Sequence, residues 1–168
     1  NNNLVIENAR ITFRNFSGVG DKFNREGNRN FAVVIDDQDM AERLIKDGWN
    51  IKSFKPRDPD EITEHFLSVT VNLGGTTKVN MVTKKNILEL DDNTISILDE
   101  ADIENCDIII RPYDWEVNGK EGRKAYLKTL YVRISEDVFA DKYDRGQPNN
   151  EPLEPLESKF TNFLGWFF

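Results

Sequence analysis

The sequence predicts a mainly β protein: a five-stranded Greek-key barrel that carries one or two helices and a C-terminal tail. Three observations predict this fold class. Short runs of alternating apolar and polar residues recur along the chain, one well-marked helical segment lies between them, and a second short helical segment precedes a long hairpin at 107–134. The chain has 168 residues, 38% of them hydrophobic, which suffices for one domain with a modest core. We expect that domain at 1–143 and a linker with a tail at 144–168.

The first expected element is a strand at 4–14, where apolar and polar side chains alternate. The alternation predicts one side made of Ala9, Ile11 and Phe13 and an outward side made of Arg10, Thr12 and Arg14. Residues 17–30 are rich in glycine, asparagine and serine, which is typical of a loop. A short apolar strand follows at 31–35.

The best-marked helix comes next. Asp36 and Asp37 offer an N-cap, and Gly48 stands where helices commonly end in a left-handed residue. The side chains between them place an apolar stripe at helical spacing, made of Met40, Ala41, Leu44 and Ile45.

Three more strands are expected at about 50–55, 66–73 and 78–83, with a proline-rich acidic loop at 56–63. The middle strand alternates cleanly, which predicts that its apolar members point inward: Leu67, Val69, Val71 and Leu73. A short helix is expected at about 94–103. This order of strands, with a helix before the last hairpin, is that of the OB-fold, a five-stranded, partly open Greek-key barrel. An immunoglobulin-like sandwich is the competing fold, but the helix before the hairpin favours the barrel.

The hairpin at 107–134 turns at Asn118-Gly119, because both residues tolerate the positive φ angles of a type I′ turn. Val117 then faces Lys120, and the pairing continues as far as Ile109 opposite Lys128. Residues directly opposite each other point to the same side of a sheet. One side therefore carries Arg111, Tyr113, Trp115, Lys124, Tyr126 and Lys128. The reverse side is expected to be core and carries Ile108, Ile110, Ala125, Leu127, Thr129 and Tyr131.

Exposed rings that alternate with arginine and lysine suit single-stranded nucleic acid. Bases stack on the rings regardless of sequence, and the cations neutralise the phosphates between them. A carbohydrate site would use more amide and carboxylate side chains than this surface offers. The alternative interpretation is that the three rings pack beneath another element while the cations extend past them into solvent.

The net charge of −8 argues against general affinity for nucleic acid, but the charges are not evenly spread. Residues 136–168 hold seven acids and three bases, so half of the net charge lies there. The remaining bases cluster with aromatic residues, which predicts a basic face. Besides the six hairpin residues named above, the hairpin offers Lys120 and Arg123 as candidate DNA contacts. The candidates outside the hairpin are Arg10 and Arg14 on the first strand, the mobile basic arm of Lys22, Phe23, Arg25 and Arg29, and the group Lys52, Phe54 and Lys55. Ordinary surface salt bridges are the alternative.

The chain ends in an apolar segment after a proline-rich acidic linker. Its aromatic and aliphatic side chains stand partly at helical spacing: Phe160, Phe163, Leu164, Trp166, Phe167 and Phe168. Such a segment is unfavourable in water, so we expect it to dock on its own domain, on a second copy in a homo-oligomer, or on another protein. A membrane is disfavoured because only Lys159 is basic nearby.

Residues 4–143 as a whole resemble the OB-fold single-stranded DNA-binding proteins of tailed bacteriophages. The stretches that carry the resemblance are LVIENARITFRNFSG at 4–18, NREGNRNFAVVIDD at 24–37, DGWNIKSFKPRD at 47–58 and RPYDWEVNGKEGRKAYLKTLYVRISEDVFADKY at 111–143. The resemblance implies a non-enzymatic accessory of replication and recombination that coats single-stranded DNA in the host cytoplasm. It maps the DNA contacts onto Arg111, Tyr113, Trp115, Lys124, Tyr126 and Lys128, and it implies a tail that recruits replication or recombination proteins. This tail keeps a final Phe168 but is more apolar and less acidic than the family pattern.

Enzymatic functions find little support in the residues. His65 is the only histidine and Cys106 the only cysteine, and no phosphate-binding glycine motif occurs. We expect no cofactor and no metal, a surface or rim position for His65 and a buried one for Cys106. Two other functions stay open. One is a protein–protein interaction or assembly module that uses the tail. The other is a nuclease with magnesium at the acidic pairs Asp36-Asp37, Asp58 with Asp60, or Asp91-Asp92, although acids at turns are usually caps.

Overall fold

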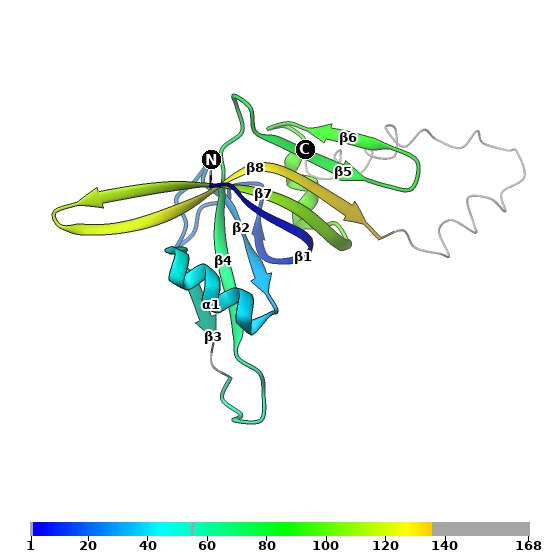
Figure 1. Ribbon diagram of the computed structural model, residues 1–168. Helices are drawn as coiled ribbons and strands as arrows, with labels where there is room; N and C mark the ends of the chain where they lie inside the picture. The colour runs from blue at the N-terminus through cyan, green and yellow to red at the C-terminus, as the bar shows by residue number, and fades with distance from the viewer. Residues whose placement is uncertain (1, 55, 136–168) are drawn as a thin grey trace, which may run out of the picture.

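Five strands close on one another to form the barrel in the computed structural model, which describes residues 2–54 and 56–135 (Figure 1). Antiparallel ladders join β1 to β2, β2 to β4, β1 to β7 and β7 to β8, and a parallel bridge between Thr70 and Tyr126 closes the ring from β4 to β8. The predicted five-stranded barrel is therefore confirmed. The barrel strands are β1 (Leu4–Asn15), β2 (Arg29–Ile35), β4 (Glu64–Val71), β7 (Ile103–Val117) and β8 (Lys120–Ile134).

Alternating side chains of the five strands fill the barrel. Phe16 and Phe31 are fully buried and stack at 5.2 Å between ring centroids. Val69 and Ile108, from two other strands, belong to the same core and are at most 1% exposed. The expected inward set of β4 is confirmed for Leu67, Val69 and Val71. Burial of these aliphatic and aromatic side chains supplies most of the free energy that stabilises the domain.

The helix α1 (Gln38–Asp47) forms where the sequence predicts it. The Asp37 carboxylate accepts a hydrogen bond from the Asp39 amide at 2.9 Å, and Gly48 ends the helix at φ 107°. Ala41 and Leu44 pack into the core, while Ile45 is exposed rather than part of the stripe. No helix in the described part of the chain is long and apolar enough to cross a membrane.

Two edges extend the barrel sheet. The strand β3 (Ile51–Phe54) pairs with β4, and the hairpin of β5 (Lys78–Val82) and β6 (Ile87–Leu90) adds to β8 through a parallel ladder. Sequence patterning missed β6, which has only four residues. The expected helix at 94–103 is instead the short 3₁₀ helix η1 (Ile95–Asp99), and its Asp99 carboxylate accepts the amides of Phe16 and Ser17.

Two bulges in β1 change which side chains face outward. The pairing register shifts between Ile6 and Ala9 and again between Thr12 and Asn15. Asn8 (φ 54°) and Phe13 (φ 49°) adopt left-handed backbone conformations at these two places. The predicted inward position of Phe13 is therefore wrong: its side chain is 64% exposed.

The β7–β8 ladder confirms most of the predicted hairpin. Asn118 and Gly119 have φ angles of 52° and 78°, and Val117 pairs with Lys120 as expected. The predicted register holds as far as Arg111 opposite Tyr126. A shift then follows, so that Ile109 pairs with Thr129 and not with Lys128. The shift changes the alternation beyond it, and the inward residues of β8 there are Leu130 and Val132 rather than Thr129 and Tyr131.

His65 is buried, contrary to the expected surface position. Its Nε2–H donates to Gln38 Oε1 at 2.7 Å, and its Nδ1 lies 2.8 Å from Ser53 Oγ, so the ring joins α1 and β3 to β4. Cys106 is buried as predicted, and burial raises the pKa of its thiol to about 12. Both side chains therefore have a structural role in the interior of the domain.

Asp107 ties the first bulge of β1 to the adjoining strands. Its carboxylate accepts hydrogen bonds from Arg133 Nη2 and from the Asn8 amide. These hydrogen bonds, that of Arg133 first, hold the pKa of Asp107 below its ordinary value. The interaction is therefore complete above about pH 4 and is lost as the pH falls through the lowered pKa.

We expect Asp107→Asn to lower the free energy of unfolding at pH 7 by about 1 kcal/mol, a value reduced by the solvent exposure of Arg133. The difference from the unsubstituted protein should shrink as the pH falls below about 4, because the native carboxylate is then protonated as well. Urea unfolding at several pH values measures this. A difference that stays constant at low pH would contradict the assigned role of the carboxylate.

Candidate nucleic-acid interface

The outer side of the β7–β8 hairpin gathers rings and cations, and we call it the hairpin face. The pairing of Arg111 with Tyr126, Tyr113 with Lys124 and Trp115 with Gly122 places one set of side chains on the same side. Tyr113 is 57% and Trp115 40% exposed. The face consists of Arg111, Tyr113, Trp115, Lys120, Lys124 and Tyr126. Lys128 lies at the register shift and is exposed.

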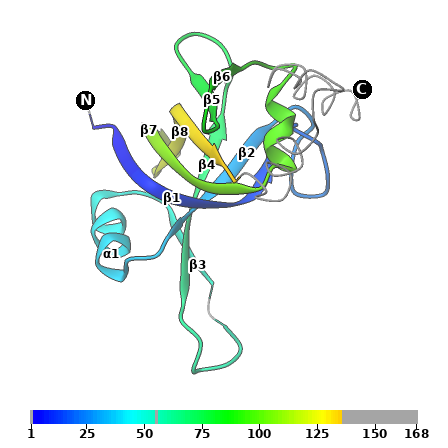
Figure 2. The same cartoon turned by 90° about the vertical axis from the view of Figure 1, so that its right-hand side faces the viewer.

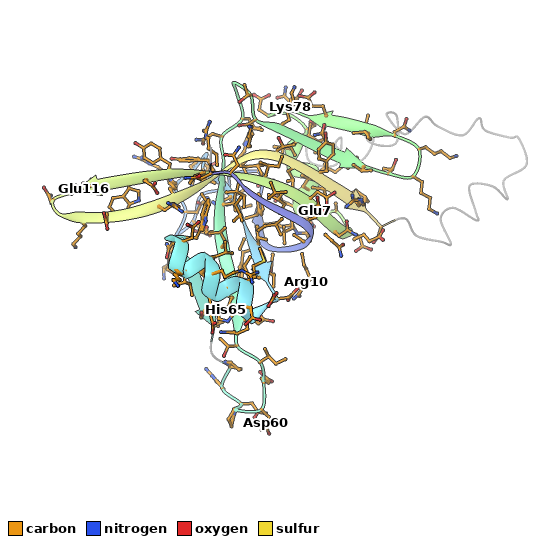
Figure 3. The ribbon with its side chains drawn as sticks, in the orientation of Figure 1. Glu7, Arg10, Asp60, His65, Lys78 and Glu116 are labelled. Carbon is orange, nitrogen blue, oxygen red and sulfur yellow. The ribbon has the colours of Figure 1, made fainter. Side chains whose placement is uncertain are left out.

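Charges of opposite sign lie on opposite sides of this hairpin. The hairpin face carries the three cations Arg111, Lys120 and Lys124 and no acid. The reverse side carries the acids of the hairpin, Asp114, Glu116 and Glu121, together with Arg123. Glu116 stands near the tip of the hairpin, where the two strands project away from the barrel (Figure 3). The segregation gives a protein of negative net charge a locally positive surface.

The rings of the hairpin face are held in place before any ligand arrives. Tyr113 and Tyr126 pack edge to face at 6.0 Å, and Lys124 Nζ lies 5.3 Å from the Tyr126 ring centroid. Trp115 lies against Gly122, where a Cβ atom would come within 2.5 Å of the indole. The glycine therefore makes the room in which the indole lies.

The hairpin face continues onto the outside of the barrel through the bridge between Thr70 and Tyr126. Phe66 lies on this outer side of β4, and Phe13 and Phe54 contact it at 5.4 and 6.3 Å between ring centroids. Phe54 is 66% exposed and, like Phe13, presents a free edge and face to solvent. We call Phe13, Phe54, Phe66 and Lys52 the barrel face.

Sequence reasoning included Phe54 and Lys52 but missed the other two residues of the barrel face. Phe66 was identifiable in principle, because it alternates with Leu67 and Val69, which were expected to point inward. Phe13 was not, because its exposure depends on the second bulge of β1.

A cleft of about 220 Å³ separates the hairpin from the β3–β4 edge, and we call it the hairpin cleft. Among its lining residues are Asn50, Lys52, Ser68, Thr70, Trp115 and Lys124. A second cleft of about 290 Å³ lies at the other end of β8, and no aromatic side chain lines it. Its Arg133 is engaged by Asp107 and Asn105, so the hairpin cleft is the better candidate for a stacked base.

Arg123 anchors the hairpin from the side opposite the hairpin face and also lines the hairpin cleft, so its contact with DNA stays a prediction. Its Nε donates to Asp114 Oδ1 at 2.6 Å, its Nη1 donates to the Asp47 carbonyl at 3.0 Å, and its guanidinium lies 5.0 Å from the Trp49 ring. The side chain is only 16% exposed. The hydrogen bond between the two side chains lowers the pKa of Asp114 and raises that of Arg123. The contacts join the hairpin to the end of α1.

Arg14 also has a structural role, and its predicted outward position is wrong. Beyond the bulge at Phe13 its Nη1 donates to the carbonyls of Leu98 and Ala101, at 2.8 and 2.7 Å. These carbonyls belong to the end of η1 and the turn after it. Arg10 is exposed and forms an ion pair of 3.0 Å with Asp36.

The basic loop between β1 and β2 has a defined conformation, although the sequence suggested a mobile arm. The Asp21 carboxylate accepts the amides of Phe23 and Asn24, and Gly27 N–H donates to the Gly18 carbonyl. Lys22, Phe23 and Arg25 are exposed on it, and Arg29 donates to the Asp92 carbonyl. Figure 2 shows this loop, in blue, on the side of β4 opposite α1.

The acidic pairs proposed for magnesium serve as caps. Asp37 caps α1, Asp58 accepts the amide of Asp60, and Asp91 accepts the amide of Thr94. Within residues 2–54 and 56–135, no group of three or more histidine, cysteine, aspartate or glutamate side chains is placed to hold a metal ion. The predicted contact Lys55 and the predicted docking residues of 160–168 lie outside the described residues.

The chain matches the family model of the phage ssDNA-binding domain over residues 1–163. Among solved structures it is similar to the C-terminally truncated single-stranded DNA-binding protein of bacteriophage Enc34, with 16% identity, a TM-score of 0.51, and coverage of 80% of this chain and 87% of that chain. The same phage protein in complex with ssDNA gives 16% identity, a TM-score of 0.50, and coverage of 82% and 89%. No curated protein sequence matches the chain. At this identity the structural likeness establishes the barrel fold.

The contrast between Arg14 and Arg10 can be measured. We expect Arg14→Ala to lower the free energy of unfolding by about 1–3 kcal/mol, because two partly buried carbonyls lose their donor. Arg10→Ala is the matched control and should change it by less than about 1 kcal/mol, because its ion pair is exposed. Urea unfolding of both variants gives the comparison, and equal losses would contradict the structural role of Arg14.

Proposed function

Since the chain belongs to the phage ssDNA-binding domain family, it binds single-stranded DNA, and we propose that it holds the strand on the hairpin face and the barrel face. In this proposal the protein coats and protects strands that phage replication and recombination expose in the host cytoplasm. It does so without a chemical reaction and with little dependence on sequence.

The observation that carries the proposal is the continuity of the two faces. Tyr126 of the hairpin face and Thr70 of β4 are bridged, so rings on the hairpin and rings on the barrel share one outer surface. Each base that stacks on an aromatic side chain contributes about 1–3 kcal/mol, and every base has a π-face to offer. Five exposed or half-exposed rings line this surface: Phe13, Phe54, Tyr113, Trp115 and Tyr126.

The cations between the rings match the phosphates of an extended strand. Lys52, Arg111 and Lys124 form no ion pair with another described residue, so binding a phosphate does not first require an internal bond to break. The acids of the hairpin lie on its reverse side. Lys22 and Arg25 are exposed on the loop that leads into β2 and add two further cations to the described surface.

The sharpest test of the stacking surface is Trp115→Ala. We expect its affinity for oligo-dT to fall by about 1–3 kcal/mol, because one stacked base loses its ring, with little change in stability. Fluorescence anisotropy with a labelled oligonucleotide measures the affinity. Tyr131→Ala is the matched control, since Tyr131 is a partly exposed ring away from both faces, and it should bind normally. Equal losses in the two variants would argue against the hairpin face.

Salt dependence tests the cations separately. The logarithm of the affinity should fall with the logarithm of salt concentration by about 0.7 for each phosphate neutralised on a single strand. Lys52→Ala and Lys124→Ala should each reduce the slope by about that amount. Lys46→Ala, on the solvent side of α1, should leave the slope unchanged. Slopes that do not differ among the three variants would exclude these lysines as phosphate contacts.

A further inference from the structure

We propose that the hairpin cleft takes up one unpaired base and reads its hydrogen-bonding edge, so that one position of the bound strand carries a base preference. The proposal rests on the proposed function, because it assigns a distinct task to one part of the same surface. It differs from stacking alone, which tolerates every base.

The cleft has a stacking wall and polar side chains together. Trp115 supplies the wall, with its indole held against Gly122. Asn50, Ser68 and Thr70 line the cleft, and none of the hydrogen bonds among the described residues uses their side chains. An amide and two hydroxyl groups offer both donors and acceptors, which is what the edge of a base requires.

The contacts that anchor the hairpin give the cleft a defined shape. Arg123 binds Asp114 of the hairpin and the Asp47 carbonyl at the end of α1. Asn50 follows this end of α1 by three residues, and Arg123 itself lines the cleft, so the same contacts hold Asn50 near the hairpin that carries Trp115. A site held in this way discriminates better than one that forms around its ligand.

The cleft also has the size and charge that a nucleotide requires. Its volume of about 220 Å³ is enough for a single base. Lys52 and Lys124 line the same cleft, so cations are available for the phosphates next to that base.

The experiment first locates the position and then varies the base. In the shortest oligo-dT that binds with full affinity, a single abasic residue is moved along the strand. We expect one position at which it weakens binding most, and we expect Trp115→Ala to remove that difference. Placing each base at this position should then show a preference of about fivefold or more for one base over the others, the low end of discrimination by a hydrogen-bonded base edge.

Asn50→Ala should bring this preference close to one while general binding to oligo-dT persists. The matched control is Asn93→Ala, an exposed asparagine that follows β6, and it should keep the preference. Abasic residues with equal effects at all positions, or a preference that survives Asn50→Ala, would overturn the base site and leave the proposed function intact. Absence of binding to every oligonucleotide would overturn both.

Discussion

The register of the β7–β8 ladder is the constraint on which the proposed interface depends. Side chains alternate along a strand with a period of two, so a slip of one residue would exchange the two sides of the hairpin. The left-handed pair Asn118 and Gly119 closes the turn with two residues and excludes that slip. One choice of turn thus places rings and cations on one side and acids on the other. It also directs Ala125 and Leu127 into the barrel.

A hairpin with the right register still has to be held in the right place. Two connections at different points do this. The bridge from Thr70 to Tyr126 closes the barrel, and the contacts of Arg123 join the projecting part to the end of α1. An isolated two-stranded ribbon is marginally stable in water, so these connections turn a flexible ribbon into one wall of a cleft. The helix, which is an addition to the five-stranded barrel, thereby helps to shape the proposed DNA-binding surface.

Local sequence signals predicted most of the helices and strands. The side chains whose positions were predicted wrongly are those that depend on bulges or on contacts between residues far apart in the sequence. The turn at Asn118-Gly119 and the caps of α1 use residues within a few positions of each other, and both were predicted. The positions of Phe13 and Arg14 were not, because a bulge has no strong signature in an apolar–polar pattern and this one faces η1, more than eighty residues away. Thr129 and Tyr131 were misplaced for the same reason. His65 was misplaced because its partners lie on α1 and β3.

The left-handed backbone at Phe13 is unfavourable for a bulky residue, and it is associated with an exposed ring. Folding alone would favour that ring inside the barrel, so its outward position fits a surface shaped for a ligand. The same reasoning applies to charge. A net charge of −8 opposes binding to a polyanion only where the acids are close, and at physiological salt an exposed charge is screened beyond about 8 Å. A phosphate on the hairpin face therefore experiences mainly Arg111, Lys120 and Lys124, and the average charge of the chain says little about its affinity for DNA.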